Sequence, residues 1–284
     1  MKKIQILHDD KDFLFLNKPA GLIVHSDGKT IEPSLCDWIL KNYPKLKNVG
    51  EPLRTNYEER LPGRSVFTKA GSTNYEKEKI NEGEKEKEEN SVPIHNSKFI
   101  IHNSILRPGI VHRLDRETSG VIVVAKNQKA FEFLKEQFQN RKIQKTYLAF
   151  VYGELKKDED KIDRPIGRSK NDFRKWSAQR GTRGELREAV TEYKVLERGN
   201  GYSYVEVMPK TGRTHQIRVH FKAINYPIVC DSLYASNMPE ALGFKRLALH
   251  SRSLEFELKD GKKIKIEAPL PADFKKAEKL LKNA

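Results

Sequence analysis

The sequence predicts an α+β fold, with a mixed, largely antiparallel sheet as its core and helices flanking it. Short β-branched and aromatic runs recur along the chain and are joined by turns rich in Gly, Asn and Asp, which is typical of hairpins. A few stretches between them have apolar residues at helical spacing. Because hairpins outnumber strand–helix–strand units, we expect most neighbouring strands to be antiparallel.

Six segments carry the strand prediction. Residues 3–24 are expected to form a strand pair from the runs 4–7, 13–16 and 22–24, with Lys18-Pro19-Ala20-Gly21 as a turn. A further strand is expected at 147–152. Two hairpins are predicted, one of 193–197 with 202–208 and one of 254–258 with 264–268.

Helical spacing indicates four helices. Residues 33–43 place apolar side chains at 35, 38, 39 and 43 behind a Ser cap. Residues 128–140 are expected to form an amphipathic helix, and residues 274–281 a short helix close to the end of the sequence. Residues 214–224 are expected to form a helix capped by Thr214.

Residues 50–97 differ from the rest and are expected to be a flexible charged insertion in a single catalytic domain that spans 1–284. Within this stretch, residues 75–90 hold seven Glu and four Lys. Such a polar segment buries too little apolar surface to offset the entropy lost on ordering. The other interpretation is a flap that becomes ordered on RNA.

The formal net charge is +15 and points to a polyanionic partner, of which nucleic acid is the commonest. Cys36 and Cys230 are too few for a disulfide framework and have no metal-ligand spacing, so we expect neither a structural zinc nor an oxidising compartment. No apolar run of about 18 residues exists. The expected location is the cytoplasm.

The most informative stretch is 109–126, in which Asp115 lies in a charged turn between two apolar runs, 110–111 and 121–124. We expect both runs to be strands that hold the turn rigidly. An Asp in such a turn is usually a turn former, yet Arg113 and Arg116 would keep this carboxylate ionised and able to act as a nucleophile or base.

Two other stretches carry polar residues where packing alone would not place them. Residues 209–220 contain Arg213, His215, Gln216 and Arg218 in a turn that leads into a helix, which is either a phosphate site or a solvated basic face. In Lys145-Thr146-Tyr147 the aromatic ring is either a packing residue or a platform for a nucleobase.

Taken together and in this order, the stretches resemble the RluA-type pseudouridine synthases. The His-Arg-Leu-Asp run at 112–115 matches that family's catalytic signature, and the Lys-x-Tyr run and the Gly-Arg-Thr-His-Gln-Ile-Arg run at 212–218 match its other motifs. The resemblance begins near Asn17 and ends near Leu249. Cys230 stands where the family commonly has Gly, and we expect no separate N-terminal RNA-binding domain.

The resemblance implies an isomerase that converts uridine to pseudouridine in structured RNA, either ribosomal or transfer RNA, without a cofactor or metal and as a monomer. It implies that Asp115 is the catalytic carboxylate, that Tyr147 stacks on the target base and that Arg218 pairs with Asp115. Substrate contacts are expected from seven residues: His112, Arg113, Arg168, Arg213, His215, Gln216 and Leu249.

Two other functions remain open at this point. One is a catalytically silent RNA-binding or assembly factor on the same fold. The other is a carboxylate-dependent nuclease or glycosidase, which usually needs a second acid, and Glu117 is the nearest one in sequence. The sequence also leaves open whether Asp115 engages the sugar or the base.

Overall fold

The computed structural model describes residues 3–26, 32–51, 107–179 and 182–282. The predicted insertion at 50–97 therefore lies, apart from its first two residues, outside the described residues. Nine of the strands form one sheet in the order β1-β2-β3-β11-β4-β10-β9-β5, with β12 paired to β11. Three more form a small sheet in the order β7-β6-β8.

The strands have the following bounds. They are β1 Gln5–Asp9, β2 Phe13–Lys18, β3 Ser119–Ala125, β4 Gln144–Tyr152, β5 Glu159–Asp163, β6 Ile166–Ser169, β7 Trp176–Ser177, β8 Thr182–Arg187, β9 Val190–Gly199, β10 Tyr202–Pro209, β11 Leu249–Glu257 and β12 Lys263–Glu267. The helices are α1 Leu35–Asn42, the 3-10 turn η1 Pro44–Asn48, α3 Gln128–Gln139, α4 Gln216–Ala223 and α5 Ala272–Lys282.

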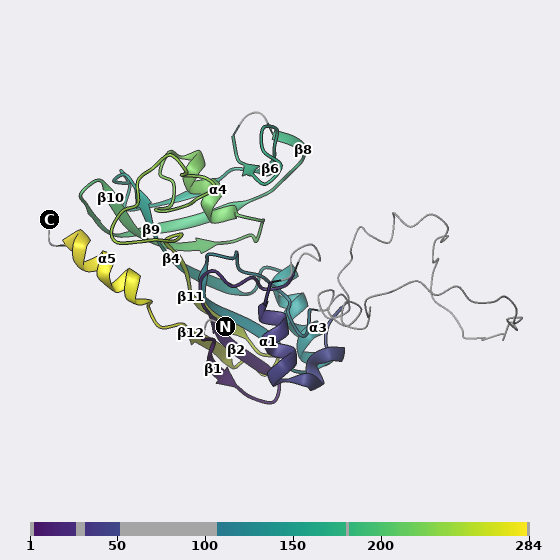
Figure 1. Cartoon of the computed structure of the whole chain (residues 1–284). Coiled ribbons are helices and arrows are strands. Elements are labelled where there is room, and N and C mark those ends of the chain that lie inside the picture. The colour runs from purple at the N-terminus through teal and green to yellow at the C-terminus, as the bar shows by residue number, and fades with distance from the viewer. Residues whose placement is uncertain (1–2, 27–31, 52–106, 180–181, 283–284) are drawn as a thin grey trace, which may run out of the picture.

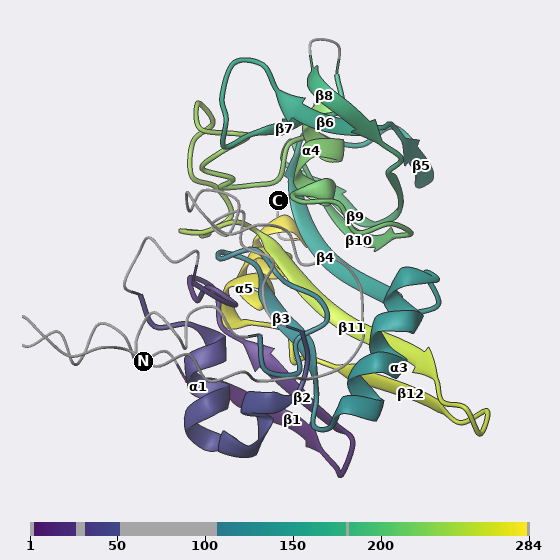
Figure 2. The ribbon, with the colours of Figure 1, turned by 90° about the vertical axis from the view of Figure 1, so that its right-hand side faces the viewer.

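The predicted α+β fold is confirmed, because every strand pair in the described residues is antiparallel except β3 with β11. The long strands β4 and β11 run through the middle of the molecule (Figure 2). They join a half that contains β1–β3, α1 and α3 to a half that contains β9, β10 and α4 (Figure 1).

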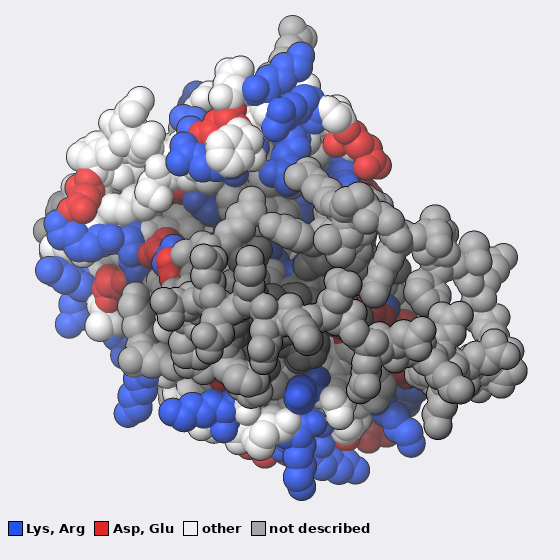
Figure 3. All heavy atoms as spheres, turned by 45° about the vertical axis from the view of Figure 1, so that its right-hand side comes forward, with Lys and Arg blue, Asp and Glu red and all other residues white. Residues whose placement is uncertain are grey.

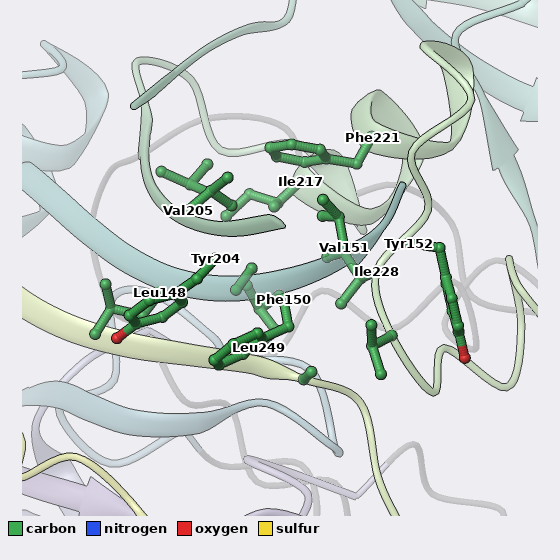
Figure 4. Packing of buried hydrophobic residues seen from close by; sticks show 14 of the residues in the cluster. Leu148, Phe150, Val151, Tyr152, Tyr204, Val205, Ile217, Phe221, Ile228 and Leu249 are labelled. Atoms are coloured by element: carbon green, nitrogen blue, oxygen red, sulfur yellow. The ribbon is translucent and has the colours of Figure 1, made fainter. Parts of the chain in front are cut away.

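The largest core lies around β4 and β10, where alternate side chains point to opposite faces of the sheet. Val151 and Val205 face Ile217 and Phe221 of α4 (Figure 4). On the other face Phe150 stacks on Tyr204 with ring centroids 4.4 Å apart, and α5 covers this face through Phe274. The sheet is thus packed on both faces, and the face with Val151 and Val205 holds α4 in place.

The sequence-based predictions were wrong in three local details. Residues 22–24 are not a strand: Gly21, at φ +77°, turns the chain, and the carbonyls of Ile23 and Val24 accept the first amides of α1. Residues 110–111 form no strand either, since Ile110 makes only an isolated bridge to Val124. Helix α4 begins at Gln216, and its cap is His215 in the left-handed region rather than Thr214.

The parallel contact between β3 and β11 depends on a glycine. Gly120 has φ +113° and pairs with Ser251, and a Cβ there would lie 2.1 Å from the Ser251 carbonyl oxygen. No side chain fits such a gap, so the two strands approach only where residue 120 has none.

We therefore expect Gly120→Ala to lower the free energy of unfolding by more than about 3 kcal/mol, because backbone strain and a backbone clash add together. Urea denaturation measures the loss. The matched control is Gly201→Ala, which shares a positive φ of +76° but has nothing within 4 Å. Equal losses in the two variants would show that the close approach at Gly120 contributes nothing.

Candidate active site

The segment that carries Asp115 is fixed along the free edge of β3. Strand β11 covers this edge only at Ser119 and Gly120. Further along, the amide of Ala125 donates to the Gly109 carbonyl at 2.8 Å, and the amide of Val123 donates to Nε2 of His112 at 3.1 Å. These two hydrogen bonds tie the segment before Asp115 to β3, and the amide of Gly21 donates to the Arg116 carbonyl at 2.8 Å on the other side of the turn.

His112 is consequently a support for the loop. Its ring stacks on Phe138 with centroids 4.7 Å apart, and burial, followed by the charge of Lys145, lowers the pKa of His112 to about 3. A neutral imidazole can accept the Val123 amide, which a protonated ring could not. His112 also lines the cleft described below. Its Nε2, however, is already used by the Val123 amide.

Asp115 faces the first half of α4, where Arg218 links it to a second acid. Nη1 of Arg218 donates to Oδ2 of Asp115 at 3.0 Å. Nε and Nη2 of the same guanidinium donate to the two carboxylate oxygens of Asp231, each at 2.8 Å. The guanidinium is thus shared between Asp115 and Asp231, with the planar, two-point contact on the side away from the cleft.

Asp231 is itself held in place by the turn that follows it. Its side chain is fully buried, and its Oδ1 also accepts the amides of Leu233 and Tyr234, both at 3.0 Å. The Tyr234 ring lies 5.1 Å from the Arg218 guanidinium carbon, as in a cation–π contact. Arg218 is therefore held by the carboxylate of Asp231 and by the ring of Tyr234, and its Nη1 donates to Asp115.

His215 completes the surroundings of Asp115. Its Nε2 lies 3.9 Å from Oδ2 of Asp115, and its Nδ1 is 2.9 Å from the Tyr234 hydroxyl, which accepts the Trp176 amide at 3.0 Å. The backbone of His215, at φ +56°, turns the chain so that the ring points back to the carboxylate. A left-handed backbone outside glycine costs free energy, so the surrounding contacts must hold His215 in it.

These neighbours decide the charge of the carboxyl group. Burial alone would raise the pKa of Asp115, but His215, Arg218 and Arg113 together lower it below its usual range. Burial also lowers the pKa of His215, against the opposing pull of Asp115. At pH 7 the site therefore contains an ionised Asp115 beside a neutral His215. Arg116, which was expected to help, pairs with Glu32 instead.

The turn before α4 is built around the side chain of Gln216. Its amide oxygen accepts the Thr211 hydroxyl at 2.6 Å and the Arg213 amide at 2.9 Å, and its nitrogen donates to Val190 and Thr191 at 3.0 Å each. These contacts use the full hydrogen-bonding capacity of the amide. Gln216 thus shapes the site and has nothing left for a substrate.

Tyr147 on β4 and Leu249 at the start of β11 complete a cleft of ≈ 590 Å³. Burial raises the pKa of Tyr147 to about 12, so its hydroxyl stays protonated at neutral pH. Asp115 is the one acid that lines the cleft in the described chain, against seven basic residues: Arg107, Arg113, Arg141, Lys145, Lys210, Arg213 and Arg218. Glu117, the second acid weighed above, is not among the lining residues.

Arg168 does not belong to this cleft. It lies on β6 in the small sheet, where its guanidinium stacks 4.3 Å above the Trp176 ring and donates to the Phe173 carbonyl. Figure 3 shows Lys and Arg side chains gathered at the end of the molecule where Figure 1 places β6 and β8. The other predicted site residues all line the cleft.

Asp231 and Tyr234 were missed as site residues. Asp231 stands directly after the apolar run at 227–230, where an acid needs a buried partner, so a signal was present in the sequence. No pattern in the sequence links Asp231 to Arg218 in particular. The described residues contain no cluster of three or more side chains suited to a metal ion and no helix able to cross a membrane.

The model of the family described as RNA pseudouridylate synthase matches residues 12–223, a stretch that includes the Asp115 loop and α4. The chain belongs to the RNA pseudouridylate synthase family. It is 31% identical over 282 residues to the uncharacterized RNA pseudouridine synthase YlyB of Bacillus subtilis, a match that covers 99% of this chain and 74% of that protein.

The chain is also similar to other RNA pseudouridine synthases in sequence and in structure. The ribosomal large subunit pseudouridine synthase D of Xanthomonas campestris is 32% identical over 96% of this chain and 68% of its own length. The solved structure of human RNA pseudouridylate synthase domain containing 4 superposes with a TM-score of 0.63 at 23% identity, covering 97% of this chain and 92% of that one. The structural likeness shows the shared fold, and the family match with its sequence relatives shows that the protein is an RNA pseudouridine synthase, which is an isomerase.

We expect Asp231→Asn to destabilise the enzyme by about 3 kcal/mol or more, because the variant leaves the buried Arg218 without its two-point partner. Urea denaturation measures the change. The control is Glu188→Gln, which breaks the exposed pair with Arg141 at 2.7 Å and should change the stability little, because water screens an exposed ion pair. A loss at Asp231 no larger than that of the control would contradict the described role of the pair.

Proposed function

We propose that Asp115 is the catalytic carboxylate with which this pseudouridine synthase isomerises uridines in structured RNA. The observation that carries the proposal is the shared guanidinium of Arg218, which keeps Asp115 ionised and aimed into the cleft. An aimed, ionised carboxylate is the group that an acid–base or nucleophilic step requires.

The reaction exchanges one bond for another. The bond between N1 of uracil and C1′ of ribose breaks, a bond between C5 and C1′ forms, and the proton lost from C5 is balanced by one gained at N1. No electrons are gained or lost overall. Three first steps are available to the Asp115 carboxylate: attack on C1′, attack on the base, or removal of a ribose proton to give a glycal.

The cleft explains how a uridine would be held. A base within a helix is out of reach, so the nucleotide must be flipped out at a cost of a few kcal/mol. The flipped base would stack on Tyr147 and contact Leu249, which face the same cleft as Asp115. Arg113, which is exposed beside Asp115, would occupy the space the base has left. Arg213 and Arg168 would contact phosphates farther out.

Ribosomal RNA is the first substrate to test, because the Xanthomonas campestris relative is named for the large ribosomal subunit. Transfer RNA is the second. As part of the same proposal, the protein acts in the cytoplasm as a monomer without a metal ion. The decisive experiment is base-resolution mapping of pseudouridine in total RNA treated with the purified protein in a chelating buffer.

We expect Asp115→Asn to abolish pseudouridine formation while RNA binding persists, because the amide keeps the size of the side chain but cannot act as a base or nucleophile. Tritium release from C5-labelled RNA measures turnover, and filter binding measures affinity. Turnover within tenfold of the wild type would rule Asp115 out as the catalytic group.

Since the pKa of Asp115 lies below the usual range, the activity should not depend on its titration near neutral pH. Activity should be lost through this group only as the pH falls below the ordinary range of Asp. An activity limit from Asp115 at a higher pH would mean that Arg218 does not hold the carboxylate as described.

Tyr147→Phe should weaken RNA binding less than Tyr147→Ala, because stacking on a base needs the ring and is worth about 1–3 kcal/mol. The two variants are compared by filter binding to the RNA identified by mapping. Equal affinities would show that the ring of Tyr147 is not a platform for the base.

A further inference from the structure

The cleft around Asp115 holds more positive charge than its carboxylates neutralise. Of the basic residues that line it, Arg218 pairs with Asp115, Arg141 with Glu188 at 2.7 Å and Lys210 with Glu192 at 2.7 Å. Four others have no ion pair with a carboxylate within the described ranges: Arg107, Arg113, Lys145 and Arg213.

Lys145 stands apart from the other three. Arg107 donates to His25, Arg213 donates to the Glu188 carbonyl, and Arg113 is exposed to water. Lys145 is half-buried at the start of β4 and donates from Nζ to the Thr211 carbonyl at 3.1 Å. An ammonium group has three N–H donors, so this contact accounts for one of them.

The surroundings leave the ammonium open toward the cleft. Gly212 lies beside the amine without a side chain, and a Cβ placed on it would lie 3.8 Å from Nζ. Burial, with a smaller effect from Arg141, lowers the pKa of Lys145 to about 8. A half-buried cation without a carboxylate partner in a cleft is a candidate for binding an anionic ligand.

Lys145 also lies at a suitable distance from the position expected for the base. Residues two apart on a strand point to the same face and lie about 6.7 Å apart. Lys145 and Tyr147 both line the cleft, so they fit this geometry. That spacing is comparable with the separation between a nucleobase and a phosphate beside it.

We propose that Lys145, at the foot of the turn 211–214, binds an oxygen of the phosphodiester next to the uridine that stacks on Tyr147. The inference rests on the proposed function, since it requires a nucleotide in this cleft. It differs from a purely structural role, in which Lys145 would only tie β4 to the turn through Thr211.

The test measures binding of end-labelled oligouridylate as salt and pH are varied. Loss of one phosphate contact to single-stranded RNA reduces the slope of log affinity against log salt by about 0.7. We expect this reduction in Lys145→Gln. If only the protonated amine binds, wild-type affinity falls about fourfold between about pH 7 and about pH 8.5, below the ionisation of uracil.

This pH dependence separates Lys145 from its charged neighbours. Arg141 stays protonated throughout, and the pKa values of His112 and His215 lie below their ordinary value, so both rings are already predominantly neutral at pH 7. Lys145→Arg should keep the salt slope and lose the pH dependence. Lys210→Gln removes the same charge from the same cleft and should retain the pH dependence, which makes it the matched control.

Each outcome decides the inference. An unchanged salt slope in Lys145→Gln with an intact thermal transition, or a fall in affinity with pH that persists in Lys145→Arg, would overturn it. If Lys145→Gln fails to fold, the comparison of Lys145→Arg with the wild type remains decisive. Pseudouridine formation by the wild-type protein, measured separately, shows whether the proposed function or this contact alone has failed.

Discussion

The site depends on one guanidinium shared by two carboxylates. Asp231 takes two N–H groups of Arg218 on the buried side and leaves a third for Asp115. Because the pair with Asp231 is geometrically complete, Arg218 cannot swing away when a substrate arrives. The position of Asp115 is thereby set by α4 and by the turn at 231–234, elements far from it in sequence.

The charges around Asp115 act differently on the phosphate and on the uncharged base and ribose of a nucleotide. With His215 neutral, Asp115, Arg218 and Asp231 together carry a net charge of −1, whereas the surrounding wall of the cleft is basic. A phosphate is drawn to the wall and repelled from the centre, while an uncharged base and ribose can approach Asp115. The cleft therefore favours a nucleotide inserted with its neutral part first.

The sequence predicted the fold class, and its resemblance to the family implied that Asp115, Arg218 and Tyr147, together with Leu249, share one site. The resemblance could be seen because each motif is a short contiguous run. The sequence was less informative where tertiary contacts determine the role of a residue. The role of Gln216 follows from four partners on β9 and the turn, and the support of His112 follows from an uncovered strand edge. Arg168 looked like its basic neighbours, yet the small sheet carries it away from the cleft.

The parallel contact between β3 and β11 has a consequence for the newly made chain. Ser119 and Gly120 pair with His250 and Ser251, so the centre of the sheet closes only after more than a hundred intervening residues have been synthesised. Contacts between residues so distant in sequence form slowly, because a long loop must close first. Leu249 reaches the cleft with the same strand. The enzyme is thus unable to complete its pocket around RNA while translation of this region is still under way.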